Sequence, residues 1–251
     1  MITLRIQEIA DTKQITLEKL SQDSGVTLEV LQDYATTPIK TLTKEVAANL
    51  REIADKLEVD VLELVMPIPQ DVDIVEVKPV DKQEAVKLEI RKIAKDRKGW
   101  NLQELSEKCK IDPIIVEFYS KQPIYKQKLA EPTSQNTLNE ICQVLDCEIK
   151  DLQVEVKAEE LPETKLRIEE LVEAVGLSLN DLSLLTSLPY EFIDLVATQP
   201  IDVNTLSGIF TENEIAEPTD NKILSDTDSD IYVLRPRFCK HLGVLFPRIC
   251  R

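Results

Sequence analysis

The sequence predicts an all-α fold, made of tandem helical units and ending in an irregular C-terminal tail. The chain of 251 residues has only 5 Gly and 30% charged residues, a composition typical of helix-rich proteins. Apolar residues recur at helical spacing, and one apolar pattern occurs three times along the chain. Because aromatic residues make up only 4%, we expect an aliphatic core.

The threefold pattern is clearest where a short motif repeats. Leu17-Glu-Lys-Leu20 recurs as Leu102-Gln-Glu-Leu105 and as Leu179-Asn-Asp-Leu182, with matching apolar positions on either side. We therefore expect three units, the third truncated, and two linkers. The predicted boundaries are 1–65 for unit one, 66–83 for a linker, 84–152 for unit two, 153–163 for a linker, and 164–210 for unit three.

Local signals place the helix starts within these units. Asn101 and Glu104 have the spacing of a capping box, as do Ser178 and Asp181. Asp112 followed by a proline predicts another helix start. Gly25 lies at the expected turn between the second and third helices of unit one, where a left-handed backbone is favoured.

The C-terminal segment 211–251 is expected to be disordered, with an acidic first part and a basic tail. Residues 235–251 contain no acid, one histidine and five cations, which are Arg235, Arg237, Lys240, Arg248 and Arg251. The tail could bind an external anionic partner, dock on this protein's own acidic body, or have no role.

Charge bears on the class of partner. The formal net charge is −16 and the pI about 4.6, so the body repels nucleic acid at long range. The alternative is that this acidity serves only solubility. The five cysteines show no paired motif, and no signal peptide or membrane span is evident. These features predict a cytoplasmic protein with reduced thiols.

Catalytic chemistry has few candidates in this sequence. His241 is the single histidine, and no Ser-His-Asp set or Gly-rich phosphate loop can be assembled. Cys142 and Cys147 lack further metal ligands nearby, so buried thiols are the preferred interpretation over a metal site. We therefore expect no enzyme activity, no cofactor and no metal.

The repeated pattern resembles the lambda-repressor/Cro-like (XRE-type) helix-turn-helix family. The resemblance is carried by the segment from Thr16 to Thr27, by Leu31 and Tyr34, and by the helix end around Leu57 to Val61. It covers residues 3–65 and 86–152, and more weakly 164–206. It implies five-helix units whose third helix enters the DNA major groove.

The positions that read bases in that family carry no Arg or Lys here. The residues at these third-helix positions are Thr27, Leu28, Glu29 and Gln32 in unit one, Asp112, Pro113, Ile114 and Glu117 in unit two, and Pro189, Tyr190, Glu191 and Asp194 in unit three. Only Gln32 is suited to reading adenine. Apolar residues beside acids favour protein contacts, although packing against a neighbouring unit would leave the same pattern.

Two functional hypotheses follow from these features. The first is a non-enzymatic regulatory or adaptor protein whose helix-turn-helix units bind a protein partner through the third helices. The alternative is a DNA-binding transcriptional regulator that uses cations outside these helices to contact phosphates. Those cations are Lys40, Lys44, Lys121, Lys126, Lys128, Arg235, Arg237, Lys240 and Arg248.

Overall fold

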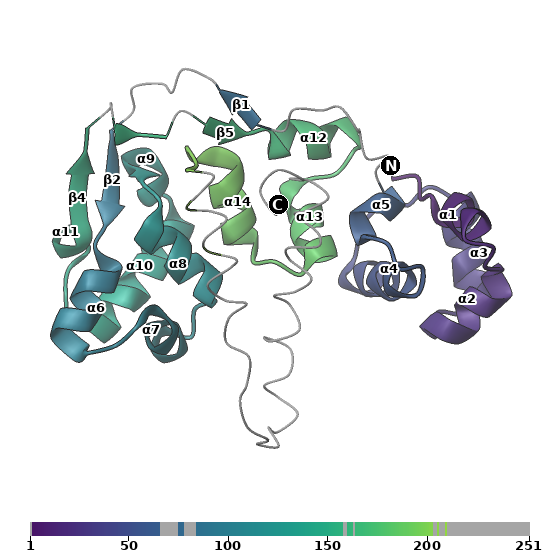
Figure 1. The fold of residues 1–251 in the computed structure, drawn as a ribbon, viewed down its shortest axis with the longest axis horizontal. Coiled ribbons are helices and arrows are strands. Elements are labelled where there is room, and N and C mark those ends of the chain that lie inside the picture. Colours follow the sequence, from purple (N-terminus) through teal and green to yellow (C-terminus); the bar gives the residue numbers. More distant parts are fainter. Residues whose placement is uncertain are drawn as a thin grey trace. The chain divides into compact units, whose positions relative to one another are not determined.

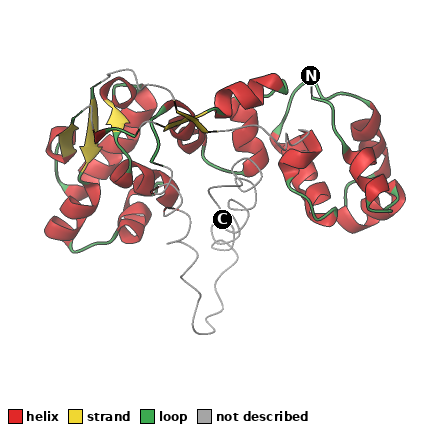
Figure 2. Cartoon of the chain, turned by 45° about the horizontal axis from the view of Figure 1, so that its top comes forward, coloured by secondary structure: helices red, strands yellow, loops and turns green. Residues whose placement is uncertain are grey.

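The computed structural model describes residues 2–65, 75–77, 84–157, 160–162 and 164–202, together with residues 205 and 209. These residues are mostly helical (Figures 1 and 2) and divide into two compact units. Unit 1 contains 2–65 and 168–188, and unit 2 contains the other described residues. None of the described helices is long and apolar enough to cross a membrane.

Unit 1 is helical except for one short backbone bridge between Ile2 and Ile39. Its helices are α1 (Ile6–Thr12), α2 (Leu17–Ser24), α3 (Leu28–Thr36), α4 (Lys44–Lys56), α5 (Val61–Val65), α12 (Ile168–Ala174) and α13 (Leu179–Thr186). Helix α13 packs on α4 and α5, where the Arg51 guanidinium donates to the Leu184 carbonyl.

The core of unit 1 is aliphatic, as the composition predicts. Leu20, Leu31, Leu50 and Ile53 are all buried, and they come from three different helices. Each lies on the apolar stripe of its own helix, so burial of these stripes against one another holds α2, α3 and α4 together.

Unit 2 combines helices with two small antiparallel sheets. The helices are α6 (Ile90–Lys98), α7 (Leu102–Cys109), α8 (Pro113–Lys121), α9 (Lys126–Leu129), α10 (Pro132–Leu145), α11 (Ile149–Leu152) and α14 (Tyr190–Thr198). The strands are β1 (Val75–Val77), β2 (Ala85–Leu88), β3 (Ile124–Tyr125), β4 (Gln153–Val156) and β5 (Thr164–Leu166).

The two sheets join segments that are far apart in the sequence. The three-stranded sheet has the order β3-β2-β4, and β1 pairs separately with β5. These strands are the difference from the expected all-α fold. β1 and β4 come from segments predicted as linkers, and β2 and β5 come from the first residues of the predicted units two and three. Val75-Glu76-Val77 and Gln153-Val154-Glu155-Val156 alternate apolar and polar residues, which is the two-residue period of a strand.

The helix junctions recur in the same backbone conformation. A left-handed residue follows the first helix of each predicted repeat, and another follows the second helix. The first set is Gln14, Gly99 and Gly176, and the second is Gly25, Lys110 and Ser187. A third junction, before α5 and before α11, has Glu58 and Asp146 in this conformation. The expected left-handed backbone at Gly25 is confirmed.

A hydrogen bond at the second junction also recurs, in the first and third repeats. Ser21 Oγ donates to the Val26 carbonyl at 2.7 Å, and Ser183 Oγ donates to the Leu188 carbonyl at 2.6 Å. The repeats predicted from the apolar pattern therefore share turn geometry. However, α12 and α13 belong to unit 1 and α14 to unit 2, so the segment predicted as the third repeat contributes to both compact units.

Candidate interaction surfaces

Helix α3 of unit 1 presents one face to solvent. The Thr27 side chain caps the helix by accepting a hydrogen bond from the Val30 backbone N–H, and Leu31 is fully buried. The opposite face then points outward. Thr27, Glu29 and Gln32 are exposed and Leu28 is half-buried, so the four predicted contact residues of this helix lie on an accessible surface.

Two of the predicted phosphate-contacting cations lie between α3 and α4. Lys40 follows the bridge formed by Ile39, and Lys44 is the first residue of α4. Both lysines are exposed. Unit 1 therefore has two solvent-accessible cations next to the end of α3.

Helix α8 of unit 2 begins at the predicted cap. The Asp112 carboxylate accepts a hydrogen bond of 2.9 Å from the Ile114 N–H, and Pro113 is the first helical residue. Glu117 forms an ion pair of 2.8 Å with Lys121, and their side chains are only 13% and 14% exposed. Lys121, a predicted phosphate contact, is thus neutralised by a neighbour on its own helix.

Helix α14 packs on α8 within unit 2. The rings of Phe118 and Phe192 meet edge to face, with centroids 5.8 Å apart, a favourable arrangement of aromatic pairs. Both phenylalanines are buried. Phe118 belongs to α8, so this helix already has a helical partner inside the unit.

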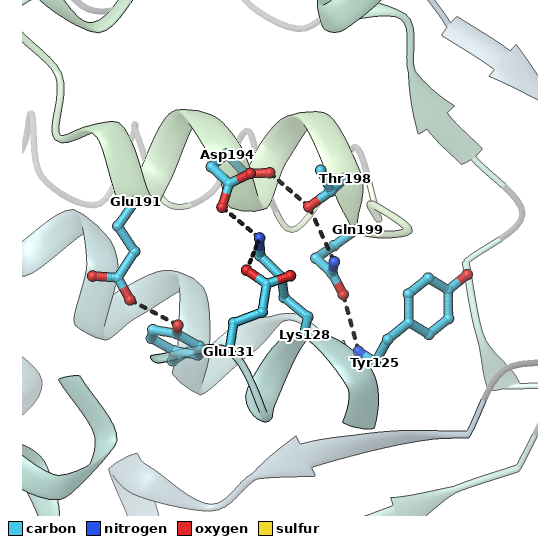
Figure 3. Close-up of polar contacts among 8 residues, drawn as sticks. Tyr125, Lys128, Glu131, Glu191, Asp194, Thr198 and Gln199 are labelled. Atoms are coloured by element: carbon cyan, nitrogen blue, oxygen red, sulfur yellow. Dashed lines mark hydrogen bonds and ion pairs between the residues drawn. The ribbon is translucent and has the colours of Figure 1, made fainter. Parts of the chain in front are cut away.

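Glu191 of α14 makes its polar contacts inside the same interface (Figure 3). The Tyr119 hydroxyl donates to one carboxylate oxygen at 2.8 Å, and the Thr137 hydroxyl donates to the other at 2.8 Å. Burial raises the pKa of the Glu191 carboxyl above its ordinary value, and the two hydroxyl donors oppose this rise. Burial also raises the pKa of the Tyr119 hydroxyl, so the phenol remains protonated and able to donate.

Asp194 lies one turn further along α14 and forms an ion pair with Lys128. Lys128 also contacts Glu131 at 2.7 Å, and its side chain is only 8% exposed. Burial lowers the pKa of the Lys128 ammonium, but the hydrogen bonds to and charges of Asp194 and Glu131 together outweigh it, so the pKa lies above its ordinary value. Figure 3 shows the side chains of Asp194, on α14, and Glu131, the residue just before α10, both directed at this amine.

The remaining predicted residues divide between paired, exposed and undescribed positions. Lys126 contacts Glu84 at 2.9 Å and Glu155 at 2.8 Å, so it too is neutralised by acids. Tyr190 is 47% exposed on the outer side of α14. The four tail cations proposed as phosphate contacts, Arg235, Arg237, Lys240 and Arg248, lie outside the described residues.

Polar contacts between the segment that follows α14 and the rest of unit 2 include several residues that the sequence did not single out. Gln199 accepts from the Tyr125 N–H at 2.9 Å, and buried Gln122 donates to the Asp202 carbonyl at 3.1 Å. One signal was available in the sequence. Phe118 stands where the first repeat has Asp33, and an aromatic residue replacing an exposed acid indicates that this face of α8 is covered.

Comparisons with protein-family models, with curated proteins and with solved structures found no match for this chain. In the described part of the chain, no three His, Cys, Asp or Glu side chains are grouped so as to hold a metal ion.

Proposed function

We propose that this chain is a non-enzymatic regulatory or adaptor protein of the cytoplasm. Its lambda-repressor/Cro-like helix-turn-helix units would make protein–protein contacts through their third helices. The shared left-handed residues at the helix junctions support the assignment of such units, because a repeated turn geometry reflects a repeated helix arrangement.

One observation carries the protein-contact part of the proposal. The third helix of the second repeat, α8, binds another helix, α14, through Phe118 and Tyr119. A third helix of this protein therefore serves as a packing surface for a helix. The exposed face of α3, with Leu28 among polar neighbours, is the surface best placed to contact another protein.

The buried polar groups of unit 2 support a structural role over a catalytic one. Glu191, Asp194 and Lys128 are charged groups of the α14 interface, and each already has partners within the unit. A catalytic carboxylate or amine needs access to a substrate atom. The hydrogen bonds and ion pairs of these three groups instead join helices of unit 2 to one another.

The second candidate function is DNA binding by unit 1. The observation that favours it is the exposure of Lys40 and Lys44 next to the end of α3. The charge of α3 opposes it, because Glu29 and Asp33 lie exposed on this helix and would face phosphates unfavourably.

A duplex-binding measurement separates these two functions. Fluorescence anisotropy of a labelled mixed-sequence duplex would be followed at low and moderate salt with the full chain. The Lys40→Gln/Lys44→Gln variant tests unit 1, and Lys95→Gln/Lys98→Gln on α6 is the control with the same charge change. We expect no salt-sensitive binding by the full chain. Binding that depends on Lys40 and Lys44, and not on the control pair, would establish the DNA function instead.

The protein-contact function is tested by its dependence on α3. Proteins that co-purify with the full chain would be compared between the wild type and the Glu29→Arg/Gln32→Ala variant. Glu140→Arg/Gln143→Ala places the same charge change on the exposed side of α10. We expect a defined partner to be lost with the α3 variant only. Partners that are retained by both variants would contradict the assignment of α3.

A further inference from the structure

Unit 2 shows how the surface formed by a third and a fourth helix binds an additional segment. Tyr119 of α8 and Thr137 of α10 both donate to Glu191 of α14, at 2.8 Å each. Phe118 packs on Phe192 beside them. The α8–α10 surface thus offers an aromatic contact and two hydroxyl donors to a helix that lies across it.

Unit 1 has the same framework on α3 and α4. Tyr34 occupies the position of Tyr119 in its repeat, and Asn49 occupies the position of Thr137. The Asn49 amide donates to the Tyr34 hydroxyl at 3.3 Å, which joins the two helices at this point. Tyr34 and Asn49 are half-buried, whereas Tyr119 and Thr137 are buried beneath α14. The surface on unit 1 is therefore the open counterpart of an occupied one.

The charge of this surface differs between the two units. Four exposed acids lie on the two helices that carry the Tyr34–Asn49 pair, namely Glu29 and Asp33 on α3 and Glu45 and Glu52 on α4. Glu45, Asn49 and Glu52 follow one stripe of α4, as Glu29 and Asp33 do on α3. Three of these acids stand where unit 2 has Ile114, Phe118 and Thr133. Within the described part of the chain, none of the four forms an ion pair with a cation.

We propose that the basic tail, residues 235–251, docks on this acidic α3–α4 surface of unit 1. The tail carries five cations and no acid. It also contains Phe238 and Phe246, which would take the part that the apolar residues of α14 have in unit 2. Opposite charges around a partly apolar centre give the complementarity that such a surface needs. An acidic helix like α14 would meet repulsion from the four carboxylates.

A long segment of chain separates the tail from the described residues. Ile209 is the last described residue, and the roughly 25 residues that lead to Arg235 can span up to about 80 Å when extended. Such a tether holds the tail at an effective concentration on the order of millimolar near the body of its own chain. A weak contact is thereby populated without a second molecule. Docking there would compete with any partner that binds α3, so the tail would regulate that surface.

Carbodiimide coupling of the full chain tests the proposal directly. The reagent joins a lysine amine to a carboxylate only where the two are in contact, and Lys240 is the single lysine of the tail. We expect peptide mass spectrometry to find Lys240 coupled to Glu29, Asp33, Glu45 or Glu52. Mixing ¹⁵N-labelled with unlabelled protein distinguishes coupling within one chain from coupling between chains.

A matched pair of variants completes the test. Asp33→Asn/Glu52→Gln removes two acids from the surface, and Glu107→Gln/Glu140→Gln removes two exposed acids from unit 2. The proposal is supported if the products that couple Lys240 to α3 and α4 are lost in the first variant and retained in the second. Coupling to carboxylates of unit 2, coupling between chains, or equal coupling in both variants would overturn it. Because no external partner takes part, these outcomes do not depend on the proposed adaptor function.

Discussion

The Glu191 carboxylate accepts hydrogen bonds from the hydroxyls of Tyr119 and Thr137, and both donors are neutral. This half-buried acid therefore joins α14 to α8 and α10 through neutral donors. The nearest charges act in opposite directions, because Asp194 raises the pKa of Glu191 and Lys128 lowers it. Burial has the largest effect, so the pKa of Glu191 is higher in the folded protein than the ordinary value of 4.5.

The raised pKa predicts a pH dependence of unit 2. Between pH 4.5 and the raised pKa, the folded state binds more protons at Glu191 than the unfolded state does. The contribution of this residue to stability therefore rises as pH falls through that window, and is lost as pH rises. We expect wild-type protein to gain stability relative to Glu191→Gln when the pH is lowered from 7.5 to 5.

Trp100 is the single tryptophan and lies in unit 2, so urea unfolding followed by its fluorescence reports on this unit. Other carboxylates titrate in the same range, so the difference between the two proteins is the relevant quantity. A difference that does not change with pH would contradict the role given to Glu191.

Removing the cation of the Lys128–Asp194 ion pair is predicted to lower the stability of unit 2 more than removing the cation of an exposed pair. Lys128→Met keeps the length of the side chain, but it leaves Asp194, 19% exposed, without its partner. We expect unit 2 to lose about 1–3 kcal/mol in urea unfolding, because an uncompensated and partly buried charge is unfavourable.

The control is Lys92→Met, which breaks an exposed pair with Glu89 on α6. Exposed pairs contribute little to stability, so this variant should unfold close to wild type. Equal losses in the two variants would show that the Lys128 contact is no stronger than a surface pair.

Several elements followed from the sequence because their causes are local. The capping boxes at Asn101–Glu104 and Ser178–Asp181 are confirmed, since a cap needs only residues three positions apart. Asp112 caps α8 as expected. The predominance of helix is likewise confirmed, because aliphatic periodicity specifies one buried face for each helix.

The strands and the surfaces that the polar helix positions contact could not be predicted, because both depend on contacts between distant segments. Each of the short strands pairs with a residue run far along the chain, as Val75–Val77 does with Thr164–Leu166. Glu191 and Asp194 were expected to face a partner, and in the structure they contact unit 2 itself. The periodicity of one helix identifies its polar positions, but it does not specify which surface those positions meet. That choice rests on Phe118 and Phe192, which belong to different repeats.

The turn between the second and third helices of each repeat predicts a reciprocal pair of substitutions. Lys110 adopts φ 58° where the first repeat has Gly25 at φ 74°. Side chains with a Cβ are disfavoured in this region, so Lys110→Gly should stabilise unit 2 by about 0.5–1 kcal/mol. Gly25→Ala should destabilise unit 1 by about 1 kcal/mol.

A Cβ at Gly25 would have no atom within 4 Å, so the cost of Gly25→Ala is conformational and not a clash. The stability of the Lys110→Gly variant is measured by urea unfolding followed by Trp100 fluorescence. The stability of the Gly25→Ala variant is measured by urea unfolding followed by circular dichroism. Effects of the same sign in the two variants would refute the shared turn geometry.

The three described cysteines predict a graded reactivity of unit 2. Cys109 and Cys142 are buried and Cys147 is half-buried. Burial raises the pKa of the Cys109 thiol to about 11 and, together with neighbouring Cys147, that of Cys142 to about 12. Relative to the ordinary value of 9.0, the thiolate of Cys109 at pH 8 is depleted about a hundredfold.

Alkylation by iodoacetamide at pH 8, followed by peptide mass spectrometry, measures each site separately. We expect Cys147 to react first, while Cys109 and Cys142 react at least about tenfold more slowly, because alkylation requires an accessible thiolate. In concentrated urea the three rates should converge, since unfolding removes the burial. Rates that already agree in the native protein would show that α7 and α10 do not shield their thiols from solvent.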